Sequence, residues 1–217
     1  MRKLFLLFCL VSTSAYSQLG NVLGNANEVI REKKYEEIDG SPYLFKSWLI
    51  GVLIDSEGKV FPDLLMKYDS YKERLEVNQS GKILEITASF YQAFTLNEVD
   101  ESSNEIKIHK FIIEKSFPGF KNPVFLELLA DGKNQLLKKH TTYFLQENVT
   151  SYGSTVSKKR FQTKSAYYIR YADKVVEVKL SKGSILENFP NQSAYFKSNK
   201  IKKEVDLIKF VDFLNME

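Results

Sequence analysis

Histidine is the side chain that acid–base catalysis near neutral pH uses most often, and this chain has two, His109 and His140. Both lie in stretches with the composition of β-strands, where a packed or surface histidine is more common than a catalytic one. Neither belongs to a His-x-His or His-Glu-x-x-His sequence, which would bring two imidazoles to one metal ion. The sequence therefore predicts no catalytic residue, no metal site and no cofactor.

Glycine–lysine pairs begin at Gly58, Gly81 and Gly132 and invite comparison with a phosphate-binding loop. None of the three has a glycine five positions earlier, and none has serine or threonine after the lysine. The stretch Asp55-Ser56-Glu57-Gly58 starts like a calcium-binding loop, but the next three residues offer no side-chain oxygen. These glycines are therefore interpreted as turn residues.

Pairs of carboxylates could hydrolyse a glycosidic bond if they lay about 5 to 10 Å apart across a cleft. Glu36, Glu37, Asp63 and Asp69 flank aromatic residues, as sugar-binding carboxylates often do. With 27 acidic residues in the chain, some such pair is always available, so solvated surface and turn roles are favoured. A carboxylate-dependent hydrolase acting on a cell-surface polymer is kept as an alternative.

The most suggestive functional feature is a set of aromatic residues around the only tryptophan. Such rings could line a pocket or groove for an apolar or sugar ligand. The competing interpretation, which we favour, is a core seam at one end of a sheet. The candidate ligand-binding residues are Trp48, Tyr43, Tyr68, Phe90, Tyr91 and Phe94.

Hairpin patterns organise the middle of the chain. Four times, an apolar and often alternating run is interrupted by a short turn rich in Asp, Asn, Gly and Lys, and is followed by another such run. Residues 90–96 and 106–113 add strand-like segments between these units. We predict an α+β fold that is mainly β, with an antiparallel meander sheet shaped as a curved sheet or half-barrel.

The spacing of apolar residues changes from a strand pattern to a helix pattern near the C-terminus, where helices are expected to cover the sheet. Ile201, Val205, Ile208 and Val211 fall on one helical face, which predicts a helix over 200–215. A capping pattern at Ser184 predicts a shorter helix over 184–189. Residues 41–217 would form one domain, preceded by a loosely ordered segment over 18–40 with weak helical character over 19–35.

Residues 1–17 have the pattern of a bacterial signal peptide. Arg2 and Lys3 precede the apolar run Leu4 to Val11, and Ala15-Tyr16-Ser17 is a small-x-small cleavage pattern before Gln18. That run would reach about 12 Å as a helix, too short for a hydrocarbon core of about 30 Å. The prediction is a periplasmic or secreted protein, cleaved near Ser17/Gln18, that is not an integral membrane protein.

Removal of this segment changes which chemistries remain. It takes away Cys9, the only cysteine, so no disulfide or thiolate chemistry is expected. Without Arg2 and Lys3, the 31 basic residues become 29 against 27 acidic ones, a net charge of +2. A nucleic-acid partner is therefore not predicted, since such partners normally require a concentrated basic surplus.

Several stretches of the chain together carry a family resemblance. They are Ser41-Pro42-Tyr43-Leu44-Phe45 with Trp48 and Gly51, Leu65-Met66-Lys67-Tyr68-Asp69, Leu128-Leu129-Ala130-Asp131-Gly132-Lys133 with Leu136-Leu137-Lys138-Lys139, Tyr167-Tyr168-Ile169, and Asp206-Leu207-Ile208-Lys209-Phe210. On these residues the chain resembles uncharacterised secreted proteins of Bacteroidota over most of its mature length. The resemblance implies no reaction, and no functional residue is carried over.

The resulting hypothesis is a non-enzymatic protein of the cell envelope, with a binding or structural role toward an unknown envelope component. One alternative is a carrier of a lipid or other apolar ligand in a half-barrel cavity, and the other is the hydrolase described above. A deep polar cleft that holds convergent acids or a His–acid pair in contact would contradict the first hypothesis. A filled interior would count against the carrier. The sequence predicts no oligomeric state.

Overall fold

The computed structural model describes residues 26–29, 35, 38–151, 154–172 and 174–216. The predicted signal peptide over 1–17 lies outside these residues, as does most of the segment 18–40. In the described part of the chain, no helix has the length and apolar character needed to cross a membrane.

Eleven strands make up a single sheet in the described residues. Their bounds are β1 Ala26–Val29, β2 Leu49–Asp55, β3 Val60–Asp69, β4 Arg74–Gln79, β5 Lys82–Ile86, β6 Tyr91–Val99, β7 Ile106–Glu114, β8 Val124–Ala130, β9 Asn134–Ser151, β10 Ser154–Tyr171 and β11 Lys174–Val178. A short 3-10 helix, η3 (Ala88–Phe90), precedes β6.

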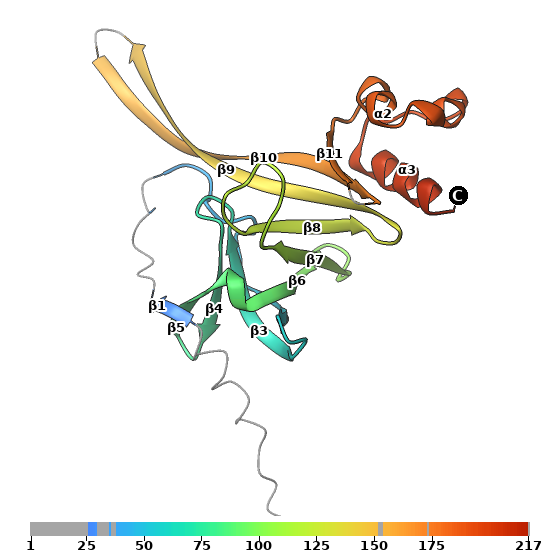
Figure 1. The fold of residues 1–217 in the computed structure, drawn as a ribbon. Helices are drawn as coiled ribbons and strands as arrows, with labels where there is room; N and C mark the ends of the chain where they lie inside the picture. The colour runs from blue at the N-terminus through green and yellow to red at the C-terminus, as the bar shows by residue number, and fades with distance from the viewer. Residues whose placement is uncertain (1–25, 30–34, 36–37, 152–153, 173, 217) are drawn as a thin grey trace, which may run out of the picture.

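The sheet is an open antiparallel one with the order β1-β5-β4-β3-β2-β6-β7-β8-β9-β10-β11. Two meanders, β2 to β5 and β6 to β11, join where β6 pairs with β2, so that Leu53 lies opposite Phe94. This confirms the predicted fold class. The sheet twists strongly, as Figure 1 shows: β3 and β4 run crosswise to β8, β9 and β10.

Aromatic rings fill the inside of the twisted first half of the sheet. The Phe94 and Phe111 rings stack with centroids 4.6 Å apart, and Tyr68 meets Phe125 edge to face at 5.3 Å. All four side chains are at most 1% exposed. Strand alternation places them on one face, where each ring removes apolar surface from water and contributes roughly 1.5 to 3 kcal/mol.

The second half of the sheet is covered on both faces. On one face, Leu136 and Ile169 pack against the C-terminal helices. On the other face, Leu137 and Tyr168 pack with Phe117 from the connection between β7 and β8. Neighbouring residues of the same strand therefore serve opposite layers, as the period of two requires.

The helical cover consists of α2 (Lys182–Asn188), the 3-10 helix η4 (Pro190–Lys197) and α3 (Glu204–Met216). The predicted helices over 184–189 and 200–215 correspond to α2 and α3. The first begins earlier because Ser181, not Ser184, is the N-cap and accepts a hydrogen bond from the Ser184 amide. The second begins later, at Glu204.

The N-terminal segment differs from the expected weak helix where it is described. Residues 26–29 form β1, which pairs with β5 at Ala26–Ile86 and Val29–Leu84. Without β1, the backbone groups on this side of β5 would be a free sheet edge, and pairing satisfies them. This tertiary contact overrides a weak local helical preference.

Residues 39–44 tie this end of the chain to the sheet. Asp39 forms a parallel bridge with Arg160, and the Pro42 carbonyl accepts hydrogen bonds from the Tyr71 amide and the Ser70 hydroxyl at 3.2 Å each. Gly40 has a φ of +85°, and a Cβ there would lie 2.7 Å from the Phe161 carbonyl oxygen. These contacts fix the position of the next residues, which line the candidate site.

Candidate functional site

A surface hollow beside Trp48, which we call the Trp48 groove, has a volume of about 860 Å³. It lies between residues 44–50 and the ends of β6 and β7. Its lining mixes apolar and charged side chains, namely Leu44, Phe45, Lys46, Ser47, Trp48, Leu49, Ile50, Asn97, Glu98, Val99, Asp100, Glu101 and Ile106.

Three apolar side chains of this groove are unusually open to solvent. Ile50 is 54% exposed, Val99 52% and Ile106 63%, although all three lie in strands. Val99 and Ile106 are paired across β6 and β7. A cluster of exposed aliphatic side chains in a hollow, next to a tryptophan, is typical of a surface that binds an apolar group.

Acidic side chains outnumber basic ones in the groove. Glu98, Asp100 and Glu101 line it, against Lys46 alone. The Ser102 hydroxyl and amide donate to Asp100 and hold the pKa of its carboxyl below the usual range. Asp100 is therefore ionised at neutral pH, and the groove presents negative charge beside its apolar wall.

A chain of five hydrogen-bonded side chains starts at Glu98 and crosses five neighbouring strands. The Glu98 carboxylate lies 3.0 Å from His109 Nε2, and His109 Nδ1 lies 2.6 Å from Glu127 Oε1. Glu127 Oε2 is 2.6 Å from His140 Nε2, and His140 Nδ1 is 3.4 Å from the Ser165 hydroxyl. Strands β6 to β10 each supply one member.

The middle of this chain is buried. His109, Glu127 and His140 are only 5 to 6% exposed. Burial raises the pKa of Glu127, but the hydrogen bonds from both histidines outweigh it and hold the pKa well below its usual range. Burial lowers the pKa of His109, but its bonds to Glu127 and Glu98 outweigh burial and leave the pKa raised. Both shifts favour the charged forms of the pair, the carboxylate of Glu127 and the imidazolium of His109.

A second hollow, of about 430 Å³, opens over these histidines. It shares Leu44, Phe45 and Glu98 with the Trp48 groove. The Phe45 ring lies 4.7 Å from the His109 ring, between the two hollows. Among the described residues, no three or more His, Cys, Asp or Glu side chains are placed to hold a metal ion.

The six aromatic residues predicted to bind a ligand do not lie together in the structure. Tyr68, Tyr91 and Phe94 are at most 1% exposed and belong to the core. Phe90 is 48% exposed and lines a different hollow, with Asp55 and Ser89. Of the six residues, only Trp48 lines the groove described above.

The sixth aromatic residue, Tyr43, lies over a buried charge cluster instead. Its hydroxyl donates to Glu76 at 3.1 Å, and Arg74 bridges Glu76 at 2.8 Å and Asp69 at 3.4 Å. Burial raises the pKa of both carboxyls, and the Arg74 guanidinium opposes that rise. The ammonium of Lys67 lies 4.2 Å from the Tyr43 ring centroid. Tyr43 therefore fastens residues 39–44 to β4.

The sequence analysis did not predict the series of hydrogen-bonded side chains that passes through Glu127. One signal could have revealed it: Glu127 is the single charged residue within the apolar run Phe125-Leu126-Glu127-Leu128-Leu129. A carboxylate on a buried strand needs partners, because an unpaired buried charge is costly. The identity of those partners depends on strand register, which the sequence pattern did not give.

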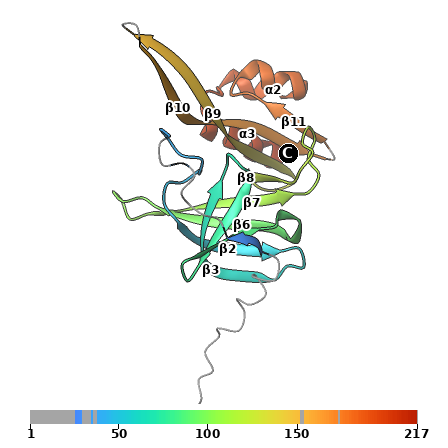
Figure 2. The same cartoon turned by 90° about the vertical axis from the view of Figure 1, so that its left-hand side faces the viewer.

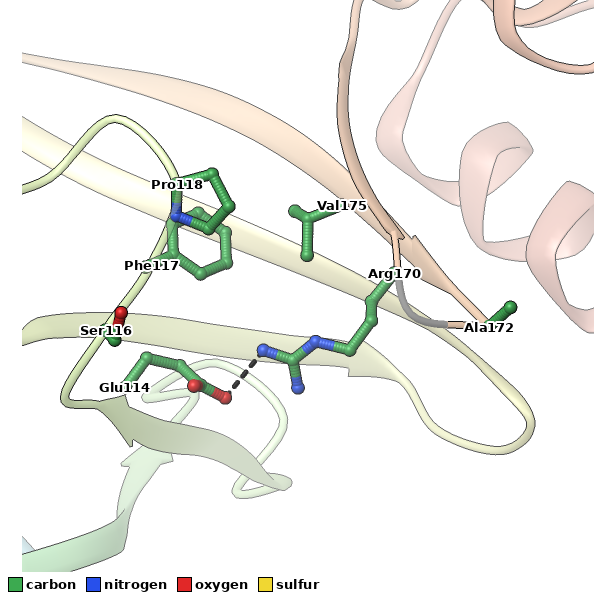
Figure 3. Close-up of a pocket in the computed structure, with 7 residues that line it drawn as sticks. All are labelled: Glu114, Ser116, Phe117, Pro118, Arg170, Ala172 and Val175. Carbon is green, nitrogen blue, oxygen red and sulfur yellow. Dashed lines mark hydrogen bonds and ion pairs between the residues drawn. The ribbon is translucent and has the colours of Figure 1, made fainter.

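Another hollow, of about 520 Å³, lies on the face of the second half of the sheet that packs with Phe117, away from the C-terminal helices (Figure 3). Arg170 points into it, but its guanidinium already donates to Glu114 at 2.6 Å and to Gln135 at 2.9 Å. With that charge compensated, the hollow offers less to a ligand than the Trp48 groove does.

Comparisons with protein-family models, curated proteins and solved structures find no match for this chain. The resemblance to secreted proteins of Bacteroidota therefore stays a prediction.

Proposed function

We propose that this protein is an extracytoplasmic binding protein without catalytic activity, and that the Trp48 groove is its binding site. The signal-peptide pattern supports the location. The observation that carries the proposal is the combination of Ile50, Val99 and Ile106, more than half exposed, with Trp48 in one hollow. Leaving this much aliphatic surface in water is unfavourable, and a ligand would cover it.

The composition of the groove favours a ligand that joins an apolar part to a positive charge. The aliphatic wall and the Trp48 ring would contact the apolar part. Asp100 and Glu101, both exposed, would face the cation and attract it. An apolar anion would meet repulsion at the same place.

A carrier with an internal half-barrel cavity receives less support. The space inside the first half of the sheet is filled by Tyr68, Phe94, Phe111 and Phe125, whose rings contact one another. The apolar ligand of that hypothesis is kept, but its place moves from the interior to the surface groove.

Trp48 fluorescence tests the proposal directly, because it is the only tryptophan. Octylammonium and octanoate have similar apolar chains and opposite charges, so they form a matched pair of probes. We expect saturable binding of octylammonium and at least about tenfold weaker binding of octanoate, a difference of about 1.4 kcal/mol.

Two variants locate the binding. Ile106→Ser should lower the affinity for both probes, because it removes part of the apolar wall. The double variant Asp100→Asn/Glu101→Gln should reduce the preference for the cation about fivefold, since exposed charges contribute up to about 1 kcal/mol each. Equal affinity of the wild-type protein for both probes, or no saturable change, would reject this proposal.

A second candidate function, acid–base catalysis, is favoured by one observation. Ser165, His140 and Glu127 form a hydroxyl–imidazole–carboxylate series like that of a serine hydrolase, although the Ser165–His140 distance is 3.4 Å. The series contains a His–acid contact, which in a deep polar cleft would contradict a non-enzymatic function.

Against catalysis, both nitrogens of His109 and both oxygens of Glu127 already have protein partners. A fluorophosphonate probe separates the two functions, because it labels an activated serine covalently. Labelling of the wild-type protein that disappears in Ser165→Ala would establish the enzyme. Absence of labelling, together with saturable octylammonium binding, would support the binding protein.

A further inference from the structure

Strands β9 and β10 extend beyond the rest of the sheet as a two-stranded ribbon, which Figures 1 and 2 show projecting away from the body of the molecule. We call residues 141–151 and 154–166 the arm. Strand β8 pairs with β9 only at residues 136–138, and β11 pairs with β10 only at residues 167–171. Within the arm, β9 and β10 therefore pair mainly with each other, from the pair Thr141–Lys164 to the pair Ser151–Ser154.

The arm has two different faces because side chains alternate along each strand. On the inner face, Phe161 is buried and its ring contacts Tyr35, Tyr71 and Phe144 at centroid distances of 5.2 to 5.8 Å. This face is held against the body. The outer face is largely exposed and consists of Tyr143, Leu145, Glu147, Lys158, Arg160, Gln162 and Lys164.

Positive charge is concentrated on the arm. Residues 141–166 contain four basic side chains and one acidic side chain, in a chain whose 31 basic and 27 acidic residues nearly balance. Lys158, Arg160 and Lys164 share the outer face of β10, and successive same-face positions are about 7 Å apart. The single acid, Glu147, pairs with Arg160 at 2.9 Å in an exposed contact, which leaves a net positive face.

Apolar side chains lie beside these cations on β9. Leu145 is opposite Arg160, and Tyr143 is opposite Gln162, with the Lys164 ammonium 5.7 Å from the Tyr143 ring centroid. Tyr143 is 47% exposed. The outer face thus presents a row of cations next to a row with an aromatic and an aliphatic side chain. This arrangement suits the boundary between anionic headgroups and acyl chains, where amphipathic rings and lysine side chains settle.

We infer that the outer face of the arm is a docking surface for an anionic lipid bilayer. The ribbon lies along the membrane, with Lys158, Arg160 and Lys164 against phosphate headgroups and Tyr143 at the interface. Charge complementarity argues for this partner, because the most protruding element of a nearly neutral molecule carries four basic side chains against one acidic side chain. The surface is separate from the Trp48 groove, so either can fail without the other.

Sedimentation with vesicles tests the inference. The full protein is mixed with vesicles of phosphatidylcholine alone or of phosphatidylcholine with phosphatidylglycerol. Binding should require the anionic lipid and should weaken as salt is added, because salt screens the attraction. Each cation near an anionic surface contributes about fivefold to the affinity, so Lys158→Gln/Lys164→Gln should bind about 25-fold more weakly.

Two further variants make the test specific. Lys197→Gln/Lys200→Gln removes the same charge from exposed positions in the helical region at the other end of the molecule, and should leave binding unchanged. Glu147→Gln removes the only acid of the outer face and should strengthen binding. All five substituted side chains are exposed, so folding should not be affected, which the Trp48 emission spectrum checks.

Three results would overturn the inference. Equal losses of vesicle binding in the two double-lysine variants would mean that only the net charge of the protein matters. Equal binding to vesicles with and without the anionic lipid would remove the electrostatic contribution. Binding to soluble polyphosphate that depends on Lys158 and Lys164, without binding to vesicles, would assign the arm to a soluble polyanion instead.

Discussion

Glu127 holds the two histidines in place, since each of its carboxylate oxygens contacts one imidazole at 2.6 Å. On β8 it lies between Phe125, which faces the first core, and Leu129, which packs against the helical core. The polar cluster therefore fills the boundary between two apolar regions. In this position its hydrogen bonds are shielded from water, so a missing partner is not replaced by solvent.

Replacing Glu127 with glutamine should destabilise the fold by roughly 3 kcal/mol, because it removes the charge that both buried histidines face. Urea unfolding followed by circular dichroism measures the loss. Glu187→Gln in α2 is the matched control, because Glu187 is exposed, and it should change stability by less than about 0.5 kcal/mol. Similar values for the two variants would show that the cluster contributes no stability.

The contribution of His109 to stability should decrease as pH rises. Its pKa in the fold lies above the ordinary value of 6.5, because the bonds to Glu127 and Glu98 outweigh burial. The folded state therefore binds this proton more tightly than the unfolded state. The stabilisation is complete below 6.5 and is lost as pH rises through the folded pKa.

Comparing the wild-type protein with His109→Gln isolates this effect from other titrating groups. The difference in unfolding free energy should be larger near about pH 5.5 than near about pH 8.5. A difference that stays constant or grows with pH would contradict the raised pKa.

At the scale of elements, the join between the two meanders depends on Gly51 in β2. A Cβ at this position would lie 1.8 Å from the Thr95 carbonyl oxygen of β6. The contact is with backbone and cannot be relieved by a side-chain rotation. A glycine is therefore required where β2 and β6 approach each other.

We expect Gly51→Ala to destabilise the protein by roughly 3 kcal/mol or more, the upper range for overpacking. Gly183→Ala in α2 is the matched control, because a Cβ there meets nothing within 4 Å. It should be neutral or stabilising by up to about 1 kcal/mol, since alanine favours a helix. Thermal unfolding of both variants gives the comparison, and equal melting temperatures would reject it.

The types of most elements followed from the sequence, but their lengths did not. The sequence pattern separates the apolar residues 136–137 from the apolar residues 143–145, but both belong to one strand of 18 residues, β9. The intervening Lys138, Lys139 and His140 broke the apolar alternation. In the structure, these polar side chains are satisfied by Glu204, Glu73 and Glu127, so the strand continues through them.

At the scale of the whole molecule, the two cores share continuous strands. Strand β8 contributes Phe125 to the first core and Ala130 to the helical core. Because a strand cannot lose its pairing at one end without weakening the other, we expect the two cores to unfold together.

Phe210→Ala tests this coupling. Phe210 is fully buried in α3 and contacts Phe189, Tyr195 and Phe196, so its truncation should cost about 3 to 5 kcal/mol. Trp48 fluorescence reports on the first half of the sheet, and far-ultraviolet circular dichroism reports on the whole chain. Both transitions should shift together, whereas a Trp48 transition that stays at the wild-type position would show that the cores unfold independently.

The sequence by itself determined the mainly β fold class, the hairpins and the C-terminal helices, because these follow from apolar period and turn residues that lie close together in the chain. Only the tertiary structure decided which functional side chains meet. Glu98, His109, Glu127, His140 and Ser165 come from five strands, and their contact depends on register and strand order across 68 positions of the chain. For the same reason, the sequence did not show that Tyr68, Tyr91 and Phe94 lie in the core while β6 and β7 contribute Val99 and Ile106 to the groove.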